Sequence, residues 1–262
     1  MSEPMVRFED GAAYERMMGT WSRIAGDVFL DWLALPPGLR CIDIGCGNGA
    51  FTDLLMERCA PAQAHGVDPA PAQLEFARGR AAGRPMQFHQ GDALGLPFPD
   101  AQFDLATMAL VIFFVPQPAK GVAEMARVVK PGGLVASYAW DVPGGGFPME
   151  PIRAQLREMG IKPMGPPVED ASRMEVLLKL WRDAGLRDVE TTEITVHRSF
   201  ANFDEFWDIN AVGSSIAPVL ARLSPAERDR LRDGTCARIP VEADGSVRPS
   251  GRANAIKGRV PA

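Results

Sequence analysis

An aspartate placed two residues before three alternating glycines is the part of this sequence best suited to chemistry. These residues are Asp43, Gly45, Gly47 and Gly49. A buried strand over residues 39–44 and a helix over residues 51–59 are predicted on either side, so the glycines form a strand-to-helix turn. Glycine tolerates a positive φ and lacks the Cβ that would hold a ligand away from the backbone. The segment therefore predicts a loop that contacts a bound ligand directly.

Residues 45–50 also satisfy the Gly-x-Gly-x-x-Gly/Ala pattern of dinucleotide-binding proteins. A pyrophosphate binds to amide groups at a helix N-terminus, and a carboxylate at Asp43 pointing into the same crevice would repel it. A cationic ligand would be attracted by that carboxylate. The glycine pattern alone leaves both ligands open.

Two further aspartates are predicted at the ends of the next two strands. Asp68 ends the segment 64–68, and Asp92 lies near the end of the segment 86–93. The carboxyl ends of successive parallel strands meet at one edge of an open sheet, where such folds bind ligands. A carboxylate after the second strand can accept both hydroxyls of a ribose. Three carboxylates are therefore expected along one ligand-binding edge.

With five elements in this order, the sequence resembles the class I S-adenosylmethionine-dependent methyltransferases from about residue 14 to residue 140. The elements are the glycine loop, Asp68, the segment 91–93, a strand over 103–109, and a helix, Pro-Gly-Gly turn and strand over 124–136. The resemblance implies an enzyme of the small-molecule branch with S-adenosyl-L-methionine as its cofactor. The implied reaction is methyl transfer to an O, N or C nucleophile of a small-molecule acceptor.

The resemblance also assigns residues to parts of the cofactor. It places the glycine loop against the methionine part, Asp68 on the ribose and the segment 91–93 at the adenine, with an N-terminal segment as a lid. Trp21 could equally be a core residue and not part of the lid. Gln73 could equally be a solvated surface residue and not a cofactor contact. No metal is implied. The predicted cofactor-binding residues are Tyr14, Trp21, Asp43, Gly45, Cys46, Gly47, Asn48, Gly49, Asp68, Pro69, Gln73, Gly91, Asp92, Ala93, Ala109 and Leu110.

Charge favours a sulfonium cofactor over NAD, because the three aspartates have no lysine or arginine cluster beside them. An NAD-dependent oxidoreductase would require a Tyr-x-x-x-Lys pair or its equivalent. Neither Tyr14 nor Tyr138 has a lysine four residues later. A non-catalytic or atypical cofactor-binding relative of the methyltransferases is a third possibility that the sequence leaves open.

No residue is predicted outright as the catalytic base. Asp141, at the end of the fifth predicted strand, and His197, in the sixth, are the two candidates, since an alcohol or phenol acceptor would benefit from a base. His65 and His89 lie within predicted strands, and a structural role is the first interpretation for both.

Seven predicted strands indicate an α/β protein with a Rossmann-like, mostly parallel seven-stranded sheet, helices on both faces and a helical cap. N-terminal helices and the cofactor-binding core occupy residues 1–142. Cap insertions over 143–170 and 201–243 are rich in aromatic and methionine side chains, which suits an apolar substrate pocket. The core continues over 171–200 and ends with a strand within 244–262.

Two local predictions concern how elements begin and end. A helix over residues 119–129 is expected to end at the Pro-Gly-Gly of 131–133, with the fifth strand over 134–140. A helix over 172–184 is expected to be capped by Ser172.

Composition limits the remaining choices. A net charge of -5 argues against a nucleic-acid surface, and the arginines of residues 222–238 alternate with acidic residues as on a solvated helix face. The longest apolar stretch, 105–115, is too short to span a bilayer, and the N-terminus lacks a signal-peptide pattern. A cytoplasmic protein with four free thiols and no membrane contact is expected. Apolar faces on the cap could pair two copies as a homodimer.

Overall fold

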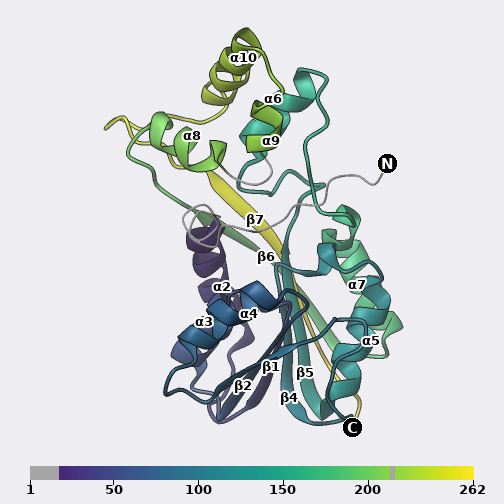
Figure 1. The fold of residues 1–262 in the computed structure, drawn as a ribbon. Helices are drawn as coiled ribbons and strands as arrows, with labels where there is room; N and C mark the ends of the chain where they lie inside the picture. Colours follow the sequence, from purple (N-terminus) through teal and green to yellow (C-terminus); the bar gives the residue numbers. More distant parts are fainter. Residues whose placement is uncertain (1–17, 213–215) are drawn as a thin grey trace.

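The computed structural model describes residues 18–212 and 216–262, and a seven-stranded sheet lies at its centre (Figure 1). The strand order is β3-β2-β1-β4-β5-β7-β6, with β7 antiparallel to both of its neighbours and β1 to β5 parallel. The predicted Rossmann-like fold is confirmed. The strands are β1 (Arg40–Ile44), β2 (Gln63–Asp68), β3 (Met86–Gln90), β4 (Phe103–Ala109), β5 (Val129–Trp140), β6 (Arg187–His197) and β7 (Ser250–Arg259).

Helices cover both faces of the sheet, and a further group lies beyond its end (Figure 1). The helices α2, α3 and α4 pack on one face, and α5 and α7 pack on the other. The remaining helices gather around the ends of the long strands β6 and β7. The helices are α2 (Thr20–Leu33), α3 (Ala50–Cys59), α4 (Pro71–Arg80), α5 (Pro118–Val128), α6 (Glu150–Glu158), α7 (Met174–Asp183), α8 (Phe203–Ala211), α9 (Ala217–Leu220) and α10 (Pro225–Cys236), with 3-10 turns η2 (Ile112–Phe114) and η3 (Glu169–Ser172).

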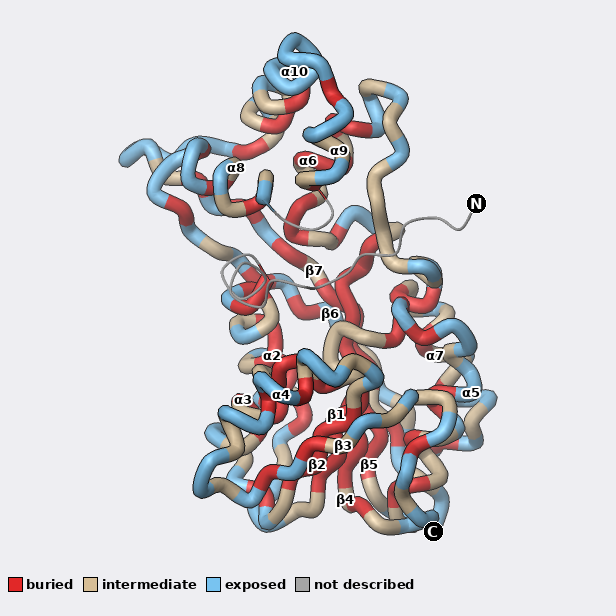
Figure 2. Tube along the Cα trace, in the orientation of Figure 1, coloured by how far each residue is buried: buried red, intermediate tan, exposed pale blue. Residues whose placement is uncertain are grey.

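Aromatic side chains fill the space between the sheet and its helices, and the strands are buried along most of their length (Figure 2). Trp181 of α7 is fully buried, and its indole N–H donates to the Val135 carbonyl at 3.0 Å. On the other face, Phe29 of α2 packs on Tyr138 with ring centroids 4.6 Å apart. Burying side chains of this size contributes about 2–3 kcal/mol each, which fixes both helices against β5.

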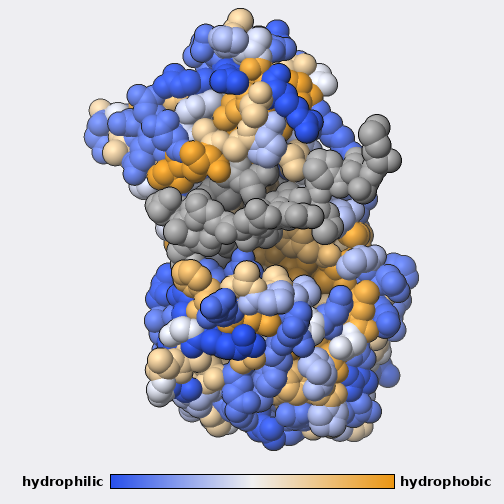
Figure 3. Space-filling view, viewed as in Figure 1, coloured by the Kyte–Doolittle hydropathy of each residue, from blue (hydrophilic) through white to orange (hydrophobic). Residues whose placement is uncertain are grey.

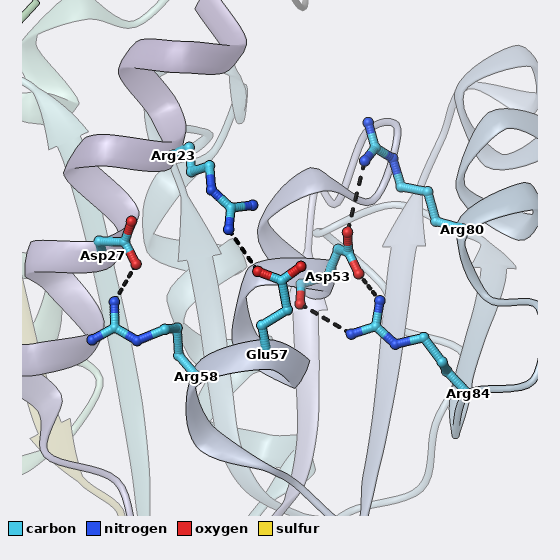
Figure 4. Close-up of polar contacts among 7 residues, drawn as sticks. All are labelled: Arg23, Asp27, Asp53, Glu57, Arg58, Arg80 and Arg84. Atoms are coloured by element: carbon cyan, nitrogen blue, oxygen red, sulfur yellow. Dashed lines mark hydrogen bonds and ion pairs between the residues drawn. The ribbon is translucent and has the colours of Figure 1, made fainter.

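Ion pairs join α2, α3 and α4 on the outside of their face of the sheet (Figure 4). Arg23 of α2 bonds Glu57 of α3 at 2.6 Å, and Asp53 of α3 pairs with Arg80 and Arg84. The exposed pair of Arg23 and Glu57 contributes little, about 0–1 kcal/mol, and the Asp53 pairs are partly exposed, so packing provides most of the stability of this contact.

Strand register brings the loops that follow β1, β2, β3 and β4 to the same edge of the sheet. Ile44 pairs with Val67, and Asp68 pairs with Gln90. Ala109 pairs with Tyr138 on the other side. The carboxyl ends of five strands therefore meet there, as the sequence predicts.

Two local predictions are wrong. The fifth strand begins at Val129, which pairs with Phe103 across a register shift, so the Pro-Gly-Gly lies inside the strand and not before it. Gly132 has a φ of +78°, which lets the backbone bend there without ending the strand. Helix α7 begins at Met174, because Ser172 lies in η3 and its hydroxyl donates to the Glu169 carbonyl at 2.7 Å.

Helices α6 and α8 to α10, here called the cap, lie within the stretches 143–170 and 201–243. Helices α6 and α10 contact each other, and Arg238 donates to the Gln155 side chain at 2.6 Å across them. Side chains of the two helix caps, Asn202 and Ser224, accept backbone N–H groups of α8 and α10. No helix within residues 18–212 and 216–262 combines the length and hydropathy needed to cross a membrane.

Candidate cofactor and active site

A cavity of about 570 Å³ lies over the carboxyl ends of β1 to β5. Its floor is formed by the glycine loop and by the ends of β2 and β4, while Gly19, just before α2, and Ser22 of α2 reach its rim. Figure 3 shows apolar surface in the recess between the cap and the sheet. The predicted ligand edge of the sheet is therefore hollow.

Backbone geometry explains the first two glycines of the loop. Gly45 has a φ of +74°, and a Cβ there would lie 2.5 Å from a methyl group of Val111. Gly47 has a φ of +52°, borders the cavity, and has open space where its Cβ would be. Gly45 is thus required by packing against the turn after β4, whereas Gly47 leaves room for a ligand.

Asp43 lies beneath this loop with 1% of its surface exposed. Its carboxylate accepts the Thr52 hydroxyl at 2.7 Å and the Thr107 hydroxyl at 3.4 Å. Burial outweighs these two bonds and raises the pKa of Asp43 to about 7. The sequence-based interpretation has Asp43 pointing freely into the crevice, and the structure shows instead a buried carboxyl held at the cavity floor.

Asp68 clamps two backbone segments together. One oxygen accepts the Gly47 N–H at 2.9 Å, and the other accepts the Ala70 N–H at 2.9 Å. These bonds join the glycine loop to the start of α4. A carboxylate has about four lone-pair sites, so two remain for hydroxyl donors from the cavity. Burial raises the pKa of Asp68 even though both bonds oppose that shift.

The third carboxylate stands at the end of β3. Asp92 accepts the Leu94 N–H at 2.8 Å, and the Gly91 N–H donates to the Asp68 carbonyl at 3.2 Å. Gln73 of α4 borders the cavity beside them. Three acidic residues and no lysine, arginine or histidine occur in the cavity wall as far as the structure describes it, so this wall is suited to a cation.

The wall beyond β4 is apolar. Leu110, Val111, Phe114 and Tyr138 line it, and the Leu110 N–H donates to the Tyr138 carbonyl at 2.8 Å. Leu110 has a φ of +60°, a strained conformation for a branched side chain. Among the described non-glycine residues with positive φ, it is the one that borders the cavity. The turn after β4 is therefore held in an unusual shape at the boundary of the polar and apolar walls.

Most of the predicted cofactor-binding residues lie together in this wall. Gly49 lies at the start of α3 and packs toward Phe88. Trp21 lies in the core, edge-on to Trp140 at 6.5 Å, and does not border the cavity; Tyr14 lies outside the described residues. The predicted residues that line the cavity are Asp43, Gly45, Cys46, Gly47, Asn48, Asp68, Pro69, Gln73, Gly91, Asp92, Ala93, Ala109 and Leu110.

The sequence analysis did not predict that α2 and the segment after η2 contribute residues to the cavity wall. Ser22 is one small polar residue on an amphipathic helix and gives no signal by itself. Val115 and Pro116, which also line the cavity, come after the apolar strand β4. Because proline favours a loop, Pro116 was a signal in the sequence for a loop at this edge of the sheet.

Neither predicted catalytic candidate borders the cavity. The Asp141 carboxylate bonds Arg252 at 2.6 Å and accepts the Gly144 N–H at 3.0 Å. His197 is exposed as the last residue of β6, where it pairs with Ser250. Asp141 has a structural role, because its bond to Arg252 links the end of β5 to β7.

Asp141→Asn is therefore expected to lower the free energy of unfolding by about 1 kcal/mol, since its partner Arg252 is partly exposed, and to leave the methyl-transfer rate nearly unchanged. Thermal unfolding and initial rates measure the two effects. A rate loss of about 100-fold at unchanged stability would instead place Asp141 in the chemistry.

The chain is similar to known methyltransferases in part of its sequence and in its fold. A family model described as a methyltransferase domain matches residues 42–137. The chain is 41% identical over 106 residues to a demethylmenaquinone methyltransferase of Desulfitobacterium hafniense, covering 38% of this chain and 42% of that protein. It is 34% identical over 139 residues to an uncharacterized methyltransferase of Mycobacterium tuberculosis, covering 52% and 54%. A putative methyltransferase of Bacillus halodurans shares the fold with a TM-score of 0.60, 21% identity and coverage of 90% and 99%.

Residues 42–137 form a methyltransferase domain of the class I S-adenosylmethionine-dependent type. The prediction of such a domain, with S-adenosyl-L-methionine as its methyl donor, is thus confirmed for this part of the chain. The chain spans about half the length of the curated relatives it matches, 42% and 54% in the two cases above. The family model ends at residue 137, before α6 begins.

Proposed function

We propose that this protein transfers a methyl group from S-adenosyl-L-methionine to an O, N or C nucleophile of a small, largely apolar acceptor. The observation that carries the proposal is the cavity over the sheet edge. Carboxylates at the ends of β1, β2 and β3 form one part of its described wall, and apolar side chains after β4 form the other. The acidic part of the wall suits a cationic methyl donor, and the apolar part suits an apolar acceptor.

Each part of the cofactor has residues suited to it. The backbone around Gly47 would contact the methionine part, and the Asp68 carboxylate would accept the ribose hydroxyls. Gly91 to Ala93 and Gln73 would enclose the adenine. The apolar wall that begins at Leu110 would then remain for the acceptor.

Methyl transfer is an in-line displacement on a carbon already activated by the sulfonium. The protein contributes mainly by aligning nucleophile, methyl and sulfur, and by keeping water away. Val111 and Phe114 would hold the acceptor in line, because they border the cavity beside Leu110. The strained backbone at Leu110 fixes that alignment at some cost in stability.

An acceptor panel tests the proposal. The relatives named as demethylmenaquinone methyltransferases make 1,4-naphthoquinol a first acceptor to try, followed by simple phenols and amines. Incubation with S-adenosyl-L-methionine should add one methyl group to at least one class, detected by mass spectrometry. Tight cofactor binding with no transfer to any class would favour the atypical cofactor-binding relative.

Cofactor affinity is expected to rise between pH 6 and pH 8, by less than about tenfold per pH unit for one proton. The pKa of Asp43 is raised to about 7, so about half of the free protein holds this proton at pH 7, and a bound cation favours the carboxylate. The same raised pKa means that the stability Asp43 contributes is lost as pH rises from about 4 to 7.

Calorimetry in two buffers of different ionisation enthalpy counts the protons released on binding. Asp43→Asn should abolish most of the release. Binding that is independent of pH, with no proton released by the wild type, would contradict this role for Asp43.

We also propose that the protein is cytoplasmic and forms a homodimer. Light scattering on the purified protein would report the oligomeric state.

A further inference from the structure

Two histidines of neighbouring strands form a stacked pair that is not part of the cavity wall. His65 of β2 and His89 of β3 have ring centroids 5.2 Å apart and an interplanar angle of 16°. His65 Nδ1 lies 3.0 Å from His89 Nε2, so one imidazole donates to the other. Such a bond requires at least one ring to supply a lone pair, which a fully protonated pair lacks.

Two phenylalanines enclose this pair. Phe98 meets both imidazoles edge-on, with centroids 5.5 Å from His65 and 5.0 Å from His89. Phe103 meets His65 at 5.3 Å. His65 is 5% exposed, and its Nε2 is buried with no hydrogen-bond partner among the described residues. The surroundings of the pair are therefore apolar and suited to neutral rings.

Phe98 belongs to the segment that follows β3, here called the adenine-side loop and defined as residues 91–98. Gly91, Asp92 and Ala93 at its start line the cavity. Near its end, the Leu96 N–H donates to Glu124 at 2.8 Å. Leu96, which is 5% exposed, and Phe98 are thus the apolar anchors of a loop whose other end borders the proposed cofactor site, and Arg127 donates to the Phe98 carbonyl at 2.9 Å.

The neighbouring charged groups that shift the pKa values of the two histidines are arginines. Arg40 of β1 opposes a charge on His65, and Arg78 of α4 opposes one on His89. Burial, followed by the neighbouring His89 and then Arg40, lowers the pKa of His65 to about 4, and burial chiefly lowers that of His89. The folded protein therefore favours the neutral pair, and the stability it contributes is lost as pH falls from about 6.5 toward 4.

We propose that His65 and His89 are a positioning pair for the cofactor site, which holds Phe98 and the adenine-side loop in place while neutral and releases them when protonated. This inference rests on the proposed binding of S-adenosyl-L-methionine. A charge on either ring would break the hydrogen bond between the rings or enter the apolar enclosure. The loop would then lose one of its two apolar anchors, and Asp92 would be held less firmly at the cavity.

Binding of S-adenosylhomocysteine, measured by calorimetry between pH 7.5 and pH 4, tests the proposal. The chain contains three histidines, which provides a matched control. The double variant His65→Phe, His89→Phe keeps the stacked rings and removes their titration, whereas His197→Gln removes the exposed histidine. Protonation of Asp43 and Asp68 affects all three proteins alike. The wild type and His197→Gln should lose about fivefold more affinity on acidification than the double variant does.

The outcomes separate the two proposals. If the folded wild type does not bind S-adenosylhomocysteine at pH 7.5, the proposed function fails, and this inference fails with it. If it binds but the double variant keeps the wild-type pH profile, the positioning role alone is overturned.

NMR titration of the wild type provides a second test, which holds even if the double variant does not fold. The imidazole signals of His65 and His89 should change together with the amide signals of residues 91–98 as the pH falls. Titration of either ring without any change in those amides would overturn the proposal.

Discussion

Asp68→Ala is expected to weaken the binding of S-adenosyl-L-methionine by roughly 10- to 100-fold, about 1.5–3 kcal/mol, through lost hydrogen bonds to a charged group. The carboxylate is proposed to hold the ribose and is bonded to the N–H groups of Gly47 and Ala70. Its removal therefore takes away a ligand contact and releases the glycine loop from α4. Calorimetric titration of the purified variant measures the loss.

Two controls make this result specific. Asp68→Asn keeps an oxygen for one backbone bond and should lose less affinity than the alanine variant. Asp53→Ala removes an aspartate from the ion pairs on the outside of α3 (Figure 4), so it should alter stability slightly and leave affinity unchanged. Wild-type affinity in Asp68→Ala would mean that the ribose lies elsewhere.

Gly45→Ala is expected to lower the free energy of unfolding by about 2–4 kcal/mol, from left-handed strain and overpacking together. The φ of Gly45 is +74°, and the new Cβ would meet Val111 at 2.5 Å. Relief of that contact would push the turn after β4 away from the loop. We therefore expect cofactor affinity to fall along with stability, and chemical denaturation and calorimetry measure the two.

Gly38→Ala is the matched control. Gly38 also has a positive φ, +81°, but a Cβ added there would have no atom within 4 Å, and Gly38 is exposed and does not line the cavity. Its substitution should cost only the conformational strain, about 1 kcal/mol. Equal costs for the two variants would show that the contact between Gly45 and Val111 is unimportant.

The sequence was most informative where function and local backbone geometry depend on the same residues. The glycine loop must turn between β1 and α3, and the apolar segments around it predict strands from local pattern alone. Asp68 and Asp92 follow strands, so their shared edge follows from topology. These features were all predictable without knowledge of distant contacts.

Other features depend on partners far away in the sequence. The burial of Asp43 depends on Thr52 and Thr107, which come from α3 and β4. Asp141 is held by Arg252, a residue 111 positions later that no local pattern connects to it. Sequence reasoning could place both aspartates at strand ends, but it could not tell a site residue from a structural one.

The backbone of Leu110 was unpredictable for a related reason. Its strained conformation is fixed by the bond to Tyr138 and by Val111 packing on Gly45, both of which are tertiary contacts. The cap poses the same difficulty on a larger scale. Residues after 137 lie outside the matched domain, so the acceptor has to be identified by experiment.

A calorimetric comparison of S-adenosyl-L-methionine with NADH at pH 7.5 tests the central claim most directly. The claim is that an acidic cavity over the sheet edge selects a cationic nucleoside donor. Saturable one-site binding of S-adenosyl-L-methionine, and no binding of NADH, is the result we predict. Binding of NADH by a folded protein that ignores S-adenosyl-L-methionine would contradict it.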